Sequence, residues 1–100
     1  MTNHQEDLSE ERRRMRMLRI AVDLTIQLFM TTPVTADQAD RTIRGLRAFS
    51  LKLFPGKGDV FDLIYLPRFR RALLEAGLKD TPEIVAEWEE RLREPPEPDA

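Results

Sequence analysis

The residues of this chain that could carry catalytic chemistry are few and far apart. His4 is the only histidine, so neither a histidine-dependent triad nor a multi-histidine metal site can be assembled. The chain has no cysteine, which excludes thiolate ligands, disulfides and cysteine nucleophiles. Tyr65 is of a type that more often packs its ring in a core than acts as an acid or base. The sequence therefore predicts that the protein is not an enzyme and has no catalytic residues, no metal site and no cofactor.

Three aspartates stand where a carboxylate could act, and each has a structural explanation. Asp23 lies in an apolar helical stretch four residues after Arg19, and this spacing favours an ion pair over a catalytic role. Asp59 and Asp62 follow a turn, where helix capping explains both. Two carboxylates are also too few for a hard cation. We therefore expect these aspartates to have structural roles.

Capping residues and turn residues divide the first half of the chain. Ser9 marks the start of a helix expected over residues 9–30. Thr35 and Gln38 have the spacing of a capping box and begin a second helix. The run from Pro55 to Gly58 then predicts a turn. It is not a phosphate-binding loop, because the earlier glycine and the following Ser or Thr are missing.

The second half of the chain is divided in the same way. Asp59 is the expected cap of a third helix, in which Pro67 must cause a kink or a break because proline lacks an N–H and clashes with the preceding turn. Gly77 predicts a left-handed helix end. Thr81 and Pro82 begin a last helix. No alternating strand pattern occurs, so the predicted fold class is all-α, a compact bundle-like domain of four or five helices.

Length and composition indicate one soluble domain. The chain has 100 residues, of which 41% are hydrophobic and 34% charged, enough for a single core. Residues 9–94 are expected to form this domain, residues 1–8 a disordered N-terminus, and residues 95–100 a disordered acidic, proline-rich tail. No apolar run approaches the roughly 18–20 residues that span a bilayer, and the N-terminus does not resemble a secretory signal. We expect a cytoplasmic protein that does not enter the membrane.

The apolar residues are concentrated in the first helix. Its polar side chains fall in a wedge of roughly 80°, which leaves more apolar circumference than a small bundle uses. Two compatible explanations stay open: the helix is wrapped by the other helices, or its surplus face pairs with a second chain. The residues assigned to this apolar interaction face are Met17, Ile20, Leu24 and Leu28. In the third helix, the residues expected to be buried are Val60, Phe61, Ile64, Tyr65, Phe69, Ala72, Leu73 and Ala76.

The net charge of −2 conceals an uneven distribution. Residues 41–71 hold eight basic and two acidic residues, whereas residues 72–100 hold three basic and nine acidic ones. Such a basic segment could contact phosphates. The alternative is that it pairs with the acidic last helix, in the same chain or in a neighbouring subunit. No aromatic residues stand among the arginines in a way that suggests base stacking, which favours that alternative. The basic residues in question are Arg41, Arg44, Arg47, Lys52, Arg68, Arg70 and Arg71.

Taken together, the sequence predicts a small non-enzymatic protein–protein interaction module that self-associates through its first helix, most simply as a homodimer. The alternative is a nucleic-acid-associated protein or regulator that uses residues 41–71 on phosphates. A small-molecule sensor with a cleft between the first and third helices is neither supported nor excluded.

Overall fold

The computed structural model describes residues 4–94, and the side chains of residues 8–94. Its four helices are α1 (His4–Thr31), α2 (Ala36–Leu53), α3 (Gly58–Glu75) and α4 (Glu83–Arg93). The part of the chain described contains no strand, so the all-α prediction is confirmed, and the arrangement fits a bundle. The predicted tail at residues 95–100 lies outside the described residues, as do residues 1–3.

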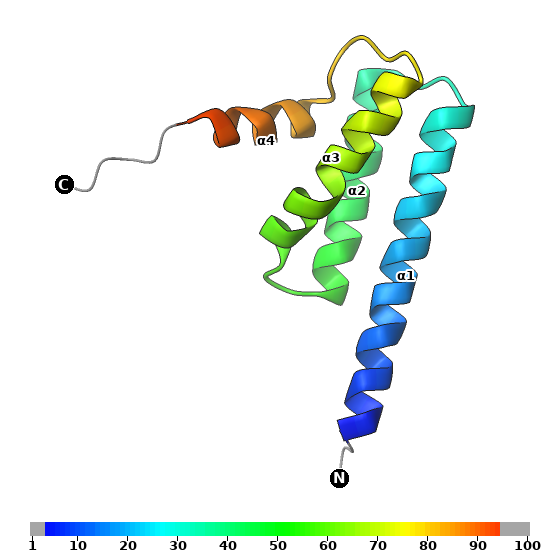
Figure 1. The fold of residues 1–100 in the computed structure, drawn as a ribbon, viewed down its shortest axis with the longest axis vertical. Helices are drawn as coiled ribbons and strands as arrows, with labels where there is room; N and C mark the ends of the chain where they lie inside the picture. The colour runs from blue at the N-terminus through cyan, green and yellow to red at the C-terminus, as the bar shows by residue number, and fades with distance from the viewer. Residues whose placement is uncertain (1–3, 95–100) are drawn as a thin grey trace, which may run out of the picture.

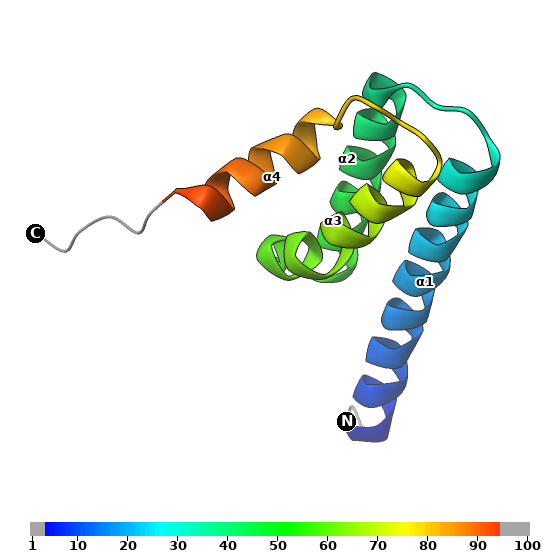
Figure 2. The ribbon, with the colours of Figure 1, turned by 45° about the horizontal axis from the view of Figure 1, so that its top comes forward.

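The helices are arranged around the α2–α3 pair. α1 packs on one side of this pair and α4 on the other (Figure 1), and no residue of α1 contacts α4 within residues 4–94. α1 has 28 residues and α2 and α3 have 18 each. At 1.5 Å per residue, the ten additional residues make α1 about 15 Å longer. Its N-terminal part accordingly projects past the ends of α2 and α3 (Figures 1 and 2).

Aromatic rings form the centre of the core between α1, α2 and α3. Phe29, Phe61 and Phe69 are at most 1% exposed. The ring centroids of Phe29 and Phe69 are 5.9 Å apart in an edge-on arrangement, and those of Phe61 and Phe69 are 6.4 Å apart. Ile43 of α2 and Leu66 of α3 are fully buried in the same cluster. These contacts join α1 to α3 by geometries that aromatic pairs prefer.

Two helix ends follow the sequence signals closely. The Gln38 N–H donates to Thr35 Oγ1 at 3.1 Å and the Thr35 N–H donates to Gln38 Oε1 at 2.9 Å, which confirms the capping box. Gly77 has a φ of 92°, and the Leu78 N–H donates to the Leu73 carbonyl at 2.9 Å. This is the Schellman ending expected after α3.

Other helix boundaries differ from the sequence prediction. α1 begins at His4 rather than Ser9, so residues 4–8 of the segment expected to be disordered are helical. The cap positions of α3 and α4 are Lys57 and Pro82, neither with a side-chain capping bond. Asp59 and Thr81 therefore do not cap these helices. As described below, a residue of α2 caps α4 instead.

Pro67 does not divide the third helix. α3 is continuous from Gly58 to Glu75 with Pro67 inside it, so no fifth helix forms in the described residues. Pro67 and the residue one turn earlier, Leu63, both lie on the exposed side of α3. Water can therefore donate to the Leu63 carbonyl in place of the N–H that Pro67 lacks. A bend at Pro67 stays a prediction.

The side of α3 that faces the core differs in part from the predicted one. Val60 and Ile64 are 47% and 49% exposed, and Ala76 is also exposed, so their assignment to the core is wrong. Leu66, which was not assigned to the core, is fully buried. The reason is that α3 contacts α1, α2 and α4, and the buried arc runs through Phe61, Leu66 and Phe69.

Candidate interaction surface

α1 has two apolar faces, and only one of them lies in the bundle. Leu18, Val22 and Phe29 are buried against α2 and α3. The predicted interaction residues form the second face, which we call the α1 stripe. They are Met17, Ile20, Leu24 and Leu28, which are 42%, 51%, 62% and 46% exposed. Because their spacing is three, four and four residues, they lie on one side of the helix. Wrapping by all three other helices does not occur, since α4 does not contact α1 in the described part of the chain.

The projecting part of α1 is exposed all around. Every side chain from Leu8 to Met17 is exposed, including the apolar Leu8 and Met15. These two residues precede Val22 and Phe29 at intervals of seven, so they continue the core side of α1 beyond the ends of α2 and α3.

The acidic last helix lies against the basic helices, as the pairing alternative predicted. Arg44 of α2 lies 3.5 Å from Glu87 and 3.9 Å from Glu83 of α4. Arg70 of α3 lies 2.6 Å from Glu89. The pKa of Glu83 is raised by a side-chain hydrogen bond with Glu87 on the same helix and by the like charge of that residue.

The other basic residues divide into paired and unpaired groups. Arg68 pairs with Asp23 at 3.2 Å, so Asp23 contacts α3 and not Arg19. Arg41 pairs with Asp37 one turn earlier, and Arg47 pairs with Asp62. Lys52 and Arg71 have no carboxylate within 4 Å among the described residues. Five of the seven basic residues thus have a carboxylate partner within the chain, so they do not form the unpaired basic surface that the nucleic-acid alternative needs.

Asp62 is the centre of a buried ion pair. Its carboxylate is 5% exposed and accepts bonds from Arg47 Nε at 2.8 Å and Nη2 at 3.1 Å. Arg91 of α4 lies 3.7 Å away. The hydrogen bonds with Asp62 raise the pKa of Arg47 above its ordinary value. Asp62 therefore joins α2, α3 and α4 and is not a helix cap.

Asp40 of α2 caps α4 from outside that helix. Its Oδ1 accepts a bond from the Ile84 N–H at 2.6 Å, and its Oδ2 accepts one from Arg44 Nε at 2.8 Å. Ile84 is the second residue of α4, where a backbone N–H has no partner within its own helix. The hydrogen bond with Asp40 also raises the pKa of Arg44. Sequence reasoning missed this role. The available signal was that Asp40 lies three residues before Ile43, on the same buried side of α2.

Gly58 makes room for the Arg47–Asp62 pair. A Cβ on Gly58 would lie 2.6 Å from Arg47 Nη2, which is closer than real contacts allow. We expect Gly58→Ala to displace the guanidinium and to lower the free energy of unfolding by about 1–2 kcal/mol. Urea unfolding followed by circular dichroism measures this. Gly45→Ala is the matched control, since its Cβ meets nothing within 4 Å. An equal loss of stability in both variants would contradict the explanation.

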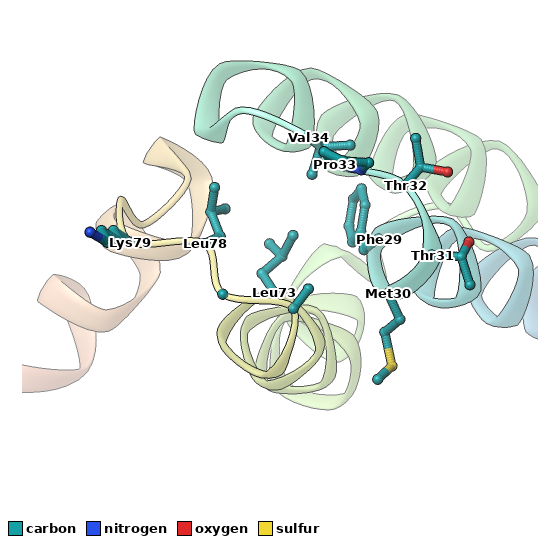
Figure 3. A pocket seen from close by; sticks show the side chains of 11 residues that line it. Phe29, Met30, Thr31, Thr32, Pro33, Val34, Leu73, Leu78 and Lys79 are labelled. Atoms are coloured by element: carbon teal, nitrogen blue, oxygen red, sulfur yellow. The ribbon is translucent and has the colours of Figure 1, made fainter.

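An apolar hollow of about 400 Å³ lies at the end of the bundle where α1 and α3 finish. Figure 3 shows Phe29, Leu73, Leu78 and Val34 around it, while Lys79 points away. This is the nearest feature to the expected cleft between the first and third helices. Its walls offer no charged group that converges on a ligand, so it gives no support to a sensor function.

Comparisons with known proteins do not assign this chain to a family. No protein-family model, curated protein or solved structure matches it. Within residues 4–94, no helix has the length and hydrophobicity to cross a membrane. Among the side chains described, those of residues 8–94, no group of three or more possible metal ligands occurs.

Proposed function

We propose that this protein is an interaction module that self-associates through the α1 stripe. The observation that carries the proposal is the exposure of Met17, Ile20, Leu24 and Leu28 on a helix whose other apolar face is already buried in the bundle. Contiguous apolar surface of this kind marks interaction sites. Isolated exposed apolar residues would not, because they are common on any protein.

A second copy of the chain suits this stripe. No charged side chain lies on this side of α1 between Met17 and Leu28, so two copies meet without like charges in the contact. In an antiparallel pair of α1 helices, Met17 of one copy faces Leu28 of the other, and Ile20 faces Leu24. Both pairings are possible at once because each is centred near residue 22. A two-fold dimer needs a surface that is complementary to itself in this way.

The apparent mass in solution tests the proposal. We expect the natural chain to have twice its monomer mass of 11.7 kDa in light scattering during size-exclusion chromatography. The double variant Ile20→Glu, Leu24→Glu should be monomeric, with dimer affinity at least about a hundredfold lower, because uncompensated charges would be buried in the contact.

The control for this experiment is Leu63→Glu. Leu63 is 68% exposed but lies on α3, so this variant should stay dimeric. Circular dichroism checks that every variant keeps its helix content. A natural chain that is monomeric at all concentrations would overturn the proposal, as would equal dissociation of the Leu63 variant.

A further inference from the structure

Three arginines converge on a hollow between α2 and α4, away from the α1 stripe. The hollow has a volume of about 290 Å³. Its charged lining consists of Arg44, Arg47, Arg91, Asp62 and Glu87, and its apolar lining consists of Ala48, Leu51 and Ile84. These lining groups sum to +1, while Asp40 and Glu83, which also pair with Arg44, lie outside the lining. We propose that this hollow binds a small organic anion, a phosphate or carboxylate attached to an apolar group.

Two of the arginines are held in place before any ligand binds. Arg47 uses Nε and Nη2 on Asp62, and its guanidinium lies close above Gly58. Arg44 uses Nε on the buried Asp40. Each guanidinium has five N–H donors, so donors are left for a ligand. Side chains fixed in this way lose little conformational entropy on binding.

The third arginine can move. Arg91 is 60% exposed, and its Nη2 lies 3.7 Å from Asp62, which is too long for a hydrogen bond. Asp62 is already satisfied by Arg47, so Arg91 can turn to a ligand at little expense. Glu87 lies 3.5 Å from Arg44 without a hydrogen bond, and an anion in the hollow replaces this contact.

The size and the apolar lining define the ligand further. Ligand pockets commonly begin near 300 Å³, so this hollow suits a molecule with about one ring. Arginine pairs well with phosphate and carboxylate because its planar donors match their oxygens. Ala48, Leu51 and Ile84 offer no polar side-chain group, so they contact the apolar part.

The test uses phenyl phosphate as the probe on the full chain. The arginine Nε–H signals in NMR spectra should shift and saturate. Affinity for phenyl phosphate should fall about tenfold in Arg44→Gln and in Arg91→Gln, since each variant loses a charge-assisted hydrogen bond to the anion. Arg41→Gln on α2 and Arg93→Gln on α4 are matched controls outside the hollow and should stay within about twofold. Phenylacetate distinguishes a carboxylate ligand from a phosphate.

Several outcomes would overturn the inference. One is the absence of saturation at millimolar phenyl phosphate, and another is an equal loss of affinity in the two control variants. If inorganic phosphate binds as tightly as phenyl phosphate, the apolar part of the proposal is wrong. Arg44→Gln could also disturb α4, because Arg44 contacts Glu83 and Glu87 of that helix. Arg91 is largely exposed, so Arg91→Gln tests the hollow without this effect. Trp88 of α4 is partly buried against the core, so its fluorescence reports such a disturbance.

Discussion

Replacing Arg47 with methionine should lower the free energy of unfolding by about 3 kcal/mol. Asp62 would then be a buried carboxylate whose nearest cation is Arg91 at 3.7 Å. Removing one partner of a buried pair costs far more than the pair itself contributes, because the other charge is left without compensation. Urea unfolding followed by circular dichroism measures the change.

A second substitution separates this explanation from a simple packing defect. The double variant Arg47→Met, Asp62→Leu removes both charges, so it should recover most of the lost stability. Arg41→Met is the surface control and should change stability by less than about 0.5 kcal/mol, since Arg41 and Asp37 are both mostly exposed. A double variant that is less stable than Arg47→Met alone would show that Asp62 does not depend on Arg47.

Replacing Asp40 with alanine should release α4 from the bundle. The Ile84 N–H and Arg44 would both lose their acceptor, and a buried N–H without a partner costs about 1–3 kcal/mol. α4 buries only Ile84 and Val85 fully, so this loss is large relative to its contacts. We expect Trp88 fluorescence to change at lower urea than the helix signal of the whole chain.

Asp37→Ala is the matched control for Asp40. It removes an acid from the same helix three residues earlier, where the side chain is 68% exposed. We expect no separate Trp88 transition in this variant. Asp40→Asn keeps an oxygen acceptor and should lie between the natural chain and Asp40→Ala. If Trp88 fluorescence changes at the same urea concentration in Asp37→Ala and Asp40→Ala, the cap from Asp40 does not keep α4 packed on the bundle.

Local signals in the sequence predicted much of the fold. Thr35 with Gln38 and Gly77 with Leu78 use bonds between residues at most five positions apart, so spacing alone identifies them. The exposed stripe could also be predicted, because α1 has more apolar circumference than its neighbours can cover.

Long-range partners could not be predicted from spacing. Asp62 resembles a capping residue locally, yet Arg47, fifteen positions earlier, binds it. Asp40 caps a helix that begins more than forty positions later. The orientation of α3 was missed for a related reason: Val60 and Ile64 fit the helical period of a core face as well as Leu66 does. Only the positions of α1, α2 and α4 decide which arc of α3 is buried.

The separation of α1 from α4 bears on thermodynamic coupling. The α1 stripe and the arginine hollow share no direct contact within residues 4–94, since α1 and α4 touch only the α2–α3 pair. Binding at one surface can alter affinity at the other only if α2 and α3 have two arrangements that both partners distinguish. Their packed aromatic contacts resist such a change. We therefore expect the two surfaces to act additively, so that one chain can hold a partner and an anion at once.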